Sequence, residues 1–154
     1  MEKTNAVRLI EKKGIEYELL SFECESALPG TEVASLLGLD PDTVFKTLVT
    51  VGASGEHHVF MVPVSAVLDL KRAAKAAGEK KIEMIKDREL LPLTGYVHGG
   101  CSPVGMKKLF DTYIDETASL YDHIYFSAGR IGCQIRMSAK DLESVIPLKY
   151  ADII

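Results

Sequence analysis

The sequence has few of the residues that commonly mark a protein's function. It contains no tryptophan, only 5 phenylalanines and 6 tyrosines, and so offers no extended platform on which nucleic-acid bases could stack. Its three cysteines, Cys24, Cys101 and Cys133, are widely spaced and form no CxxC pair. A disulfide framework, a structural zinc site and other cofactors are therefore not expected. No uncharged run approaches the ~20 residues that a membrane helix needs, and no apolar signal-peptide segment opens the chain. We expect a cytoplasmic protein that binds no membrane.

The composition is that of one ordinary globular domain spanning residues 1–154. The chain is 47% hydrophobic and 26% charged, and its net charge of −4 argues against a general DNA- or RNA-coating protein. Residues 71–108 nevertheless hold nine Lys and Arg against four Asp and Glu, whereas the segments on both sides are acidic. Two interpretations stay open: a local phosphate-binding surface, or a solvated helix face rich in lysine.

Apolar periodicity and capping residues predict a mixture of helices and strands. Helices are expected at 4–13 (capped by Thr4), 31–38 (capped by Thr31), in a turn opened by Asp40 and Pro41, at 70–78 (capped by Asp69), around Leu90, and at 138–146. Strands are expected at 15–22, 44–51, 57–64, around Ile82, from Tyr96 into a glycine-rich turn, and at 112–114, 124–127, 133–137 and 148–151. Hairpin signals outnumber strand–helix–strand units, so the expected fold class is α+β, with a curved, partly closed, barrel-like mixed sheet and peripheral helices.

Common catalytic signatures are missing. The chain has no GxGxxG, Walker A, HExxH or GxSxG motif. The adjacent His57 and His58 would point to opposite faces of a strand, so they cannot share a metal ion, and we interpret them as solvated turn residues. His98 precedes a glycine turn, where a hydrogen-bonded strand histidine is the plainer interpretation.

The string GGCSPVG at residues 99–105 is the strongest local feature. Its two glycines permit a tight turn and close approach of a ligand to the backbone, and the backbone N–H groups could face a carbonyl or phosphate oxygen. A simple tight connection explains it equally well. The string SAGRIG at 127–132 has the same two interpretations, a hairpin loop or the wall of a small pocket.

Lys46 lies within the apolar run VFKTLV and must reach solvent, pair with an anion or line a cleft. Cys101 and Cys133 have no evident activating histidine, so buried, inert thiols are the better interpretation of both.

Taken together, these strings resemble the YbaK/EbsC family of aminoacyl-tRNA deacylases, which are similar to the editing domain of bacterial prolyl-tRNA synthetases. The resemblance runs almost end to end. Its most specific parts are VFKTLV at 44–49 and GGCSP at 99–103, supported by VPVSAVLDLKRAAKAAGEKKIEM at 62–84 and YFSAGRIG at 125–132.

The resemblance implies a set of site residues. Catalytic roles fall to Lys46 and to the backbone of the turn at Gly100, Cys101 and Ser102. The aminoacyl pocket would be lined by Phe22, Gly99, Pro103, Ser127, Gly129 and Gln134. Contacts with tRNA phosphates would come from Lys71, Arg72, Lys75, Lys107 and Lys108. Phe22 and Gln134 stand where many cysteine-specific members carry tyrosine and aspartate, which leaves the amino-acid preference open.

The reaction that the resemblance implies is cleavage of the ester between an amino acid and the terminal adenosine of a mischarged tRNA. Cys-tRNA(Pro) is the expected substrate, with Cys-tRNA(Cys) as a second, and the substrate's own thiol is the expected nucleophile. The partners would be the acceptor end of tRNA and, as a candidate, prolyl-tRNA synthetase. Two alternatives stay open: a deacylase of Ala-tRNA(Pro), and a module that binds aminoacyl-tRNA or nucleotides without catalysis.

Overall fold

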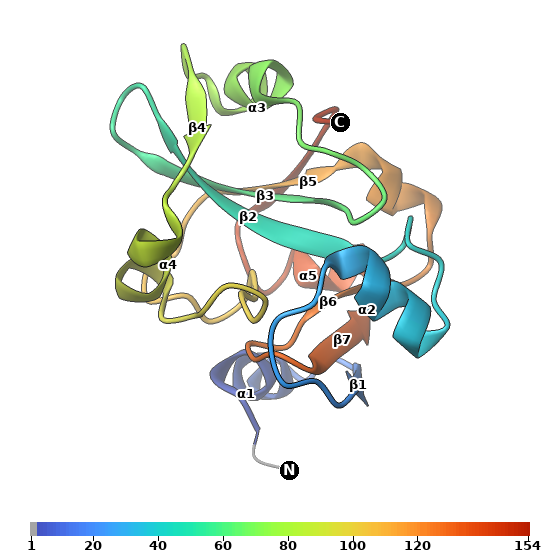
Figure 1. Cartoon of the computed structure of the whole chain (residues 1–154). Helices are drawn as coiled ribbons and strands as arrows, with labels where there is room; N and C mark the ends of the chain where they lie inside the picture. The colour runs from blue at the N-terminus through green and yellow to red at the C-terminus, as the bar shows by residue number, and fades with distance from the viewer. Residues whose placement is uncertain (1–2) are drawn as a thin grey trace.

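The protein has two β-sheets and surrounding helices, shown in Figure 1 as a computed structural model that describes residues 3–154. The strands are β1 (Glu18–Ser21), β2 (Phe45–Gly52), β3 (His57–Pro63), β4 (Ile82–Met84), β5 (Thr112–Asp115), β6 (Ile124–Ser127), β7 (Cys133–Met137) and β8 (Leu148–Ala151). The helices are α1 (Asn5–Lys12), α2 (Gly30–Leu37), α3 (Leu70–Ala77), α4 (Asp87–Thr94), the 3-10 helix η1 (Glu116–Leu120) and α5 (Ala139–Leu142). No helix in this described part is long and apolar enough to cross a bilayer.

The sheets differ in size and strand direction. The smaller sheet has the order β1-β7-β6 and is antiparallel, whereas the larger has the order β4-β2-β3-β5-β8. In the larger sheet β4, β2 and β3 are antiparallel neighbours, and β5 is parallel to both β3 and β8. The α+β fold class is therefore confirmed.

The sheets do not close into a barrel, so that part of the prediction is wrong. Within the described part of the chain they meet at one isolated parallel bridge between Val44 and Tyr125, where the Tyr125 N–H donates to the Thr43 carbonyl at 3.0 Å. Beyond this bridge β2 diverges from β6, and its next residues border a cavity instead of another strand.

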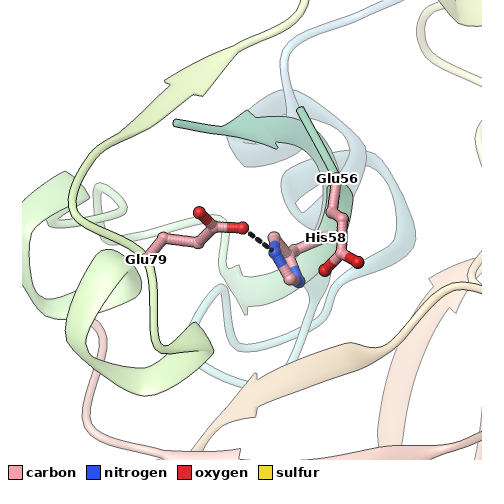
Figure 2. Close-up of side chains that lie close together, drawn as sticks. All are labelled: Glu56, His58 and Glu79. Carbon is pink, nitrogen blue, oxygen red and sulfur yellow. Dashed lines mark hydrogen bonds and ion pairs between the residues drawn. The ribbon is translucent and has the colours of Figure 1, made fainter. Parts of the chain in front are cut away.

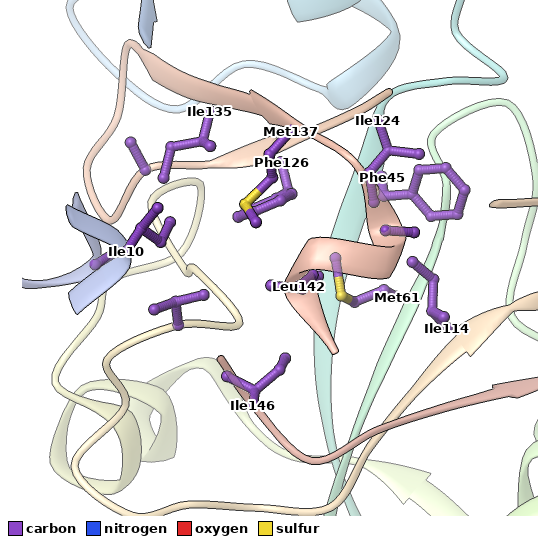
Figure 3. Close-up of a cluster of buried hydrophobic side chains, with 14 of the residues drawn as sticks. Ile10, Phe45, Met61, Ile114, Ile124, Phe126, Ile135, Met137, Leu142 and Ile146 are labelled. Atoms are coloured by element: carbon purple, nitrogen blue, oxygen red, sulfur yellow. The ribbon is translucent and has the colours of Figure 1, made fainter. Parts of the chain in front are cut away.

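The main core fills the space between the two sheets, where α1 and α5 also pack (Figure 3). Phe45, Met61 and Ile114 come from the larger sheet, and Phe126 and Ile135 from the smaller one. All five are at most 2% exposed. Burying a side chain of this size contributes about 1.5–3 kcal/mol, so this shared core holds the sheets in a fixed relation.

The opposite face of the larger sheet is covered by α3. Ala73 and Ala74 pack onto Phe60 and Val62, and the Phe60 ring stacks on Tyr113 with centroids 5.3 Å apart. The small alanine side chains let the helix approach the sheet closely. The central strand β3 is therefore buried on both faces, whereas the outer strands β4 and β8 keep exposed residues.

Local signals predict many elements correctly. The β2–β3 hairpin, β6, β7 and β8 are confirmed, and so are the caps of α1 and α3, where Thr4 accepts from Val7 and Asp69 from the first N–H groups of α3. The Asp40-Pro41 turn is not helical, the segment after Tyr96 is a loop instead of a strand, and β1 and α5 are shorter than expected.

The predicted start of α2 is also wrong. Pro29, not Thr31, is the N-cap residue, because its carbonyl accepts the N–H groups of Glu32 and Val33. Proline holds φ near −54° here, which suits the entry to a helix. Thr31 therefore lies inside the first turn and caps nothing.

Candidate active site

A cavity of about 440 Å³ opens beside the free edge of β2. At one end of this edge, Val44 is bridged to β6. At the other end, β2 pairs with β4 only from Thr50 onward. The residues between have no strand beside them on this edge. The walls come from α2 and its preceding loop, β2, the end of β3, the β4–α4 connection, the 98–101 turn, β6 and β7. A cavity of this size suits a small ligand or the end of a larger one.

Lys46 supplies a cation to this cavity. Its side chain is half-buried, and burial lowers the pKa of its ammonium group. Within residues 3–154 it forms no ion pair and no side-chain hydrogen bond. The charge is thus partly withdrawn from water and has no carboxylate partner, so it remains available to an anion or a polarised carbonyl.

Two buried oxygens in the cavity walls also lack hydrogen-bond partners among residues 3–154. They are Thr47 Oγ1 on β2 and Gln134 Oε1 on β7, and both residues line the cavity. A buried polar atom without a hydrogen bond costs about 1–3 kcal/mol, so a ligand that donates to these oxygens would recover that energy. Gln134 is expected here from the sequence, whereas Thr47 is not, because a threonine in a strand carries no signal of its own.

The first turn of α2 faces the same cavity through Gly30 and Thr31. No side chain caps this helix end. Free N–H groups and the helix dipole make such an end attractive to negative charge. Gly30 is required for packing, because a Cβ there would lie 2.3 Å from Cγ1 of Val64.

The 99–103 turn contributes Gly99 and Cys101 to the cavity wall. It is wedged between two other loops. Gly99 has φ +86° and a Cβ there would lie 2.4 Å from Cβ of Ala27, while a Cβ on Gly100 would lie 2.9 Å from Cα of Arg130. Both glycines are therefore needed for close backbone packing, so the plain structural interpretation of the motif is correct alongside its place in the cavity wall.

The backbone donors of this turn are not equivalent. The Gly100 N–H donates to the Val97 carbonyl at 3.0 Å and is not free for a ligand, contrary to expectation. The N–H groups of Cys101 and Ser102 form no hydrogen bond in the part of the chain that the structure describes. The Ser102 hydroxyl is buried and accepts from the Val104 N–H, so it does not serve as a nucleophile.

Cys101 is an inert thiol despite its position. Burial raises its pKa to about 12, so the thiol stays protonated at neutral pH. Only the thiolate is a good nucleophile. Cys133 is likewise buried, and His98, which lines the cavity, forms no hydrogen bond to either cysteine among the described residues. The side chain of Cys101 is therefore a wall residue, and only its backbone retains a candidate catalytic role.

The remaining predicted pocket residues fall into two groups. Ser127 lines the cavity, and its hydroxyl accepts from the Gly129 N–H at 3.2 Å. Gly129, Phe22 and Pro103 do not line it. Gly129 has φ +105° and makes room for Tyr96, and the Phe22 N–H pairs with the Gly132 carbonyl. These three residues support the loops around the cavity and do not form its surface.

The predicted tRNA-binding residues do not form one group: three lie on α3 and two lie in the loop before β5. Lys71, Arg72 and Lys75 lie on α3, which lines no part of this cavity. Arg72 is already paired with Asp69 and with Asp152, whose Oδ1 lies 3.0 Å from its guanidinium. The basic segment therefore does not form one surface beside the cavity. Lys107 and Lys108 line a second cavity, described below.

Outside the cavity, His58 is buried, so its interpretation as a solvated turn residue is wrong. Its Nε2 lies 2.7 Å from Glu79 Oε2, and both side chains are 6% exposed (Figure 2). Glu79 also accepts from the backbone and hydroxyl of Ser54. These hydrogen bonds lower the pKa of the Glu79 carboxyl to about 2, and the bond from the Ser54 hydroxyl contributes most.

This cluster joins the β2–β3 hairpin to Glu79, which follows the C-cap residue of α3, Gly78. With Glu56, the pair would offer a metal ion three ligand atoms within 4.8 Å of one another. The Nε2 atom of His58 is already engaged with Glu79, which makes the cluster a clamp between two elements, while the buried Nδ1 atom has no hydrogen-bond partner among the described residues.

Comparisons with known proteins agree with this geometry. EbsC from Enterococcus faecalis, assigned as a Cys-tRNA(Pro)/Cys-tRNA(Cys) deacylase, is 42% identical over 153 residues, which is 99% of this chain and 93% of EbsC. A proline–tRNA ligase from Pelobacter propionicus is 32% identical over 77 residues, 50% of this chain but 13% of the ligase. A crystal structure assigned as a trans-editing enzyme for prolyl-tRNA synthetase superposes with a TM-score of 0.86 at 25% identity, covering 99% and 98% of the two chains.

The family comparison covers most of the cavity. Residues 26–145 match the aminoacyl-tRNA editing domain, a span that includes α2, Lys46, Thr47, the 99–103 turn and Gln134. The chain therefore belongs to the family of aminoacyl-tRNA editing domains.

Proposed function

We propose that this protein is a trans-editing deacylase that cleaves the ester of a mischarged aminoacyl-tRNA, with Cys-tRNA(Pro) as the main substrate and Cys-tRNA(Cys) as a second. The observation that carries the proposal is the 440 Å³ cavity in which an unpaired lysine, an uncapped helix end and two unpartnered oxygens meet. The assignment of EbsC and the editing-domain match support the same reaction.

The positive groups suit the tRNA side of the ester. Lys46 and the first turn of α2 both border the cavity and both favour negative charge. A single-stranded RNA end brings a phosphodiester and a ribose, and proteins that read RNA sequence usually take such unpaired ends. Lys46 has the reach and the freedom to hold either this phosphate or the carbonyl oxygen of the ester.

The unpartnered oxygens suit the amino-acid side. Thr47 Oγ1 and Gln134 Oε1 need hydrogen-bond donors, and an aminoacyl group carries an ammonium with three N–H bonds. A cysteinyl group also carries an S–H donor. Gln134 is neutral, so its Oε1 accepts a hydrogen bond without bringing a negative charge into the cavity.

The chemistry needs no nucleophile from the protein. The side-chain thiol of the cysteinyl substrate attacks its own carbonyl carbon, forming a C–S bond, and the bond from that carbon to the ribose oxygen breaks. The thiol proton goes to the ribose oxygen, so the products are a cyclic thioester of cysteine and uncharged tRNA. The inertness of Cys101 and the internal hydrogen bonds of Ser102 and Ser127 agree with this route.

The protein would contribute orientation and charge stabilisation. The oxygen of the ester carbonyl becomes negative as the thiol attacks, and donors already in place lower that barrier without rearrangement. Lys46 and the free N–H group of Cys101 both belong to residues that line the cavity, so they are candidate donors to this oxygen, whereas Ser102 is buried outside the lining. A substrate on tRNA places the reaction in the cytoplasm, with prolyl-tRNA synthetase as a candidate partner.

The direct test is turnover on a panel of mischarged tRNAs. Cysteinyl-, alanyl-, seryl- and prolyl-tRNA(Pro) are incubated with the protein, and the loss of the ester is followed. Release of cysteine from Cys-tRNA(Pro) in excess of spontaneous hydrolysis supports the proposal. If Ala-tRNA(Pro) is hydrolysed fastest, the assigned substrate changes to Ala-tRNA(Pro). If all four tRNAs bind without turnover, the protein is a non-catalytic binding module.

A further inference from the structure

The structure holds a second cavity, of about 620 Å³, on the other side of the 99–108 segment. Its walls come from the end of α1, the 103–110 segment, the start of β5 and the residues before β8. Among the described residues, none lines both this cavity and the first one. The second cavity is therefore a separate hollow, and the proposed deacylation assigns nothing to it.

The charge of this lining is entirely positive. Lys12 and Lys13 come from the end of α1, Lys107 and Lys108 come from the loop, and no Asp or Glu of the described chain lines the cavity. None of the four lysines forms an ion pair within residues 3–154. In a chain of net charge −4, four unpaired cations around one hollow form a local site for an anion.

A structural explanation accounts for only half of this cluster. Lys12 and Lys13 stand at the C-terminal end of α1, where cations compensate the helix dipole. Lys107 and Lys108 lie outside any helix, and Lys107 approaches only the Pro92 carbonyl, at 3.4 Å. The two pairs are far apart in sequence yet converge on the same cavity, and helix capping gives no reason for that.

The floor between the lysines is apolar. Its buried residues are Val104 and Ile146, Met106 and Phe110 are partly buried, and Leu109 at the rim is 77% exposed. A hollow with cations at the rim and apolar side chains below suits a ligand that has both phosphates and flat or apolar faces. The sugar-phosphate backbone and bases of RNA have this combination. An inorganic anion would use the rim alone.

The two cavities share one wall. Gly99 and Cys101 line the first, whereas Pro103 and Val104 line the second. Because two residues span at most about 7 Å, the linings approach each other closely across this turn. A ligand long enough to extend around the turn could therefore contact both.

We propose that this lysine-lined cavity binds the phosphate backbone of the tRNA whose aminoacyl end occupies the first cavity. The inference rests on the proposed function for the choice of tRNA, and it assigns tRNA contact to Lys12, Lys13, Lys107 and Lys108. It moves that role away from α3, whose basic residues line neither cavity. The site binds without sequence discrimination, because phosphate contacts carry no base information.

The test measures the affinity of the protein for uncharged tRNA(Pro) over a range of salt concentrations. A variant with Lys12, Lys13, Lys107 and Lys108 all changed to Gln is compared with wild type. The control is Lys71→Gln with Lys75→Gln, lysines of α3 that border neither cavity, made together with Lys80→Gln and Lys149→Gln so that the same number of charges is removed.

The proposal predicts a steep fall in affinity for the first variant only. Its affinity should drop at least tenfold at physiological salt, and its log–log salt slope should decrease by about 0.9 for each phosphate that the variant no longer neutralises. Hydrolysis of a small aminoacyl ester should be unchanged. An equal drop in the control, or wild-type affinity and slope in the first variant, would overturn the proposal. So would unchanged tRNA affinity together with abolished binding to prolyl-tRNA synthetase, which would assign the cavity to a protein.

Failure of this inference and failure of the proposed function are distinguishable. Binding of uncharged tRNA requires no turnover, so it can be abolished in the variant even if the wild type hydrolyses nothing. Conversely, if the wild type and the four-lysine variant deacylate Cys-tRNA(Pro) equally well, the proposed function stands and only this binding site is refuted.

Discussion

Removal of the Lys46 charge should abolish most of the deacylase activity. An ammonium about 4 Å from a developing oxyanion contributes about 4 kcal/mol at an effective dielectric constant of about 20. Lys46 is half-buried, so solvent screens part of this interaction, and about 3 kcal/mol is a fair magnitude. That corresponds to roughly a hundredfold in rate. Lys46→Ala should therefore lose about two orders of magnitude in the single-turnover rate on Cys-tRNA(Pro).

The fold should survive this change. The core residues of β2 are Phe45 and Val49, while Lys46 belongs to no buried apolar cluster. Lys46→Arg should also lose much of the activity, because a planar guanidinium does not occupy the position of a compact ammonium. Lys71→Ala, on a helix outside the cavity, is the matched control. A Lys46→Ala protein with unchanged melting temperature and more than about a third of the activity would refute the reasoning.

The pH dependence gives an independent check on the same group. Burial lowers the pKa of Lys46, so its cation is fully present below that value and is lost as the pH rises through it. The enzymatic rate, after subtraction of spontaneous ester hydrolysis, should fall on the alkaline side at a pH below the ordinary lysine value of 10.5. The fall should be missing from the residual activity of Lys46→Ala.

Other residues give further expectations. Thr47→Val removes a buried hydroxyl that has no hydrogen-bond partner among the described residues, so the melting temperature should stay the same or rise. The kcat/KM value should fall about tenfold. A loss of stability in this variant would instead show a structural role for the hydroxyl. Cys101→Ala should keep most activity because the thiol, with a pKa of about 12, does not ionise, and an inactive, folded variant would make it the nucleophile. Glu79→Gln should lower the melting temperature at neutral pH. The pKa of Glu79 is lowered from 4.5 to about 2, so the stability that its carboxylate contributes is present above pH 4.5 and fades as the pH falls toward 2. The melting temperatures of the two proteins should therefore converge near pH 2. A difference that persists at pH 2 would contradict this assignment.

Local patterns predict what depends on neighbours in sequence. The β2–β3 hairpin follows from a β-branched run, a glycine turn and a second such run, and α3 follows from Asp69, an alanine-rich segment and Gly78. Lys46 stands out because a lone cation in an apolar strand needs an explanation, and the 99–103 turn stands out by its glycines. These two features do meet in one cavity.

What the sequence leaves open depends on contacts between distant segments. The sheets are joined at an isolated bridge between Val44 and Tyr125, two residues far apart in the sequence, and no local pattern predicts this contact. Thr47 becomes noticeable only because its hydroxyl is buried without a partner. Phe22 does not line the cavity, and its N–H donates to the Gly132 carbonyl, a contact between distant segments that no local pattern indicates. The sequence likewise gives no sign that the end of α1 and residues 107–108 line the same cavity.

The central claim is that the substrate's own thiol completes a site that lacks a protein nucleophile. The most direct measurement compares the deacylation of Cys-tRNA(Pro) with that of Ser-tRNA(Pro), which differ by one atom, and identifies the first product. The account predicts a large preference for cysteine and a cyclic thioester released before free cysteine. Equal rates on both tRNAs, with free amino acid as the first product, would contradict it and make water the nucleophile.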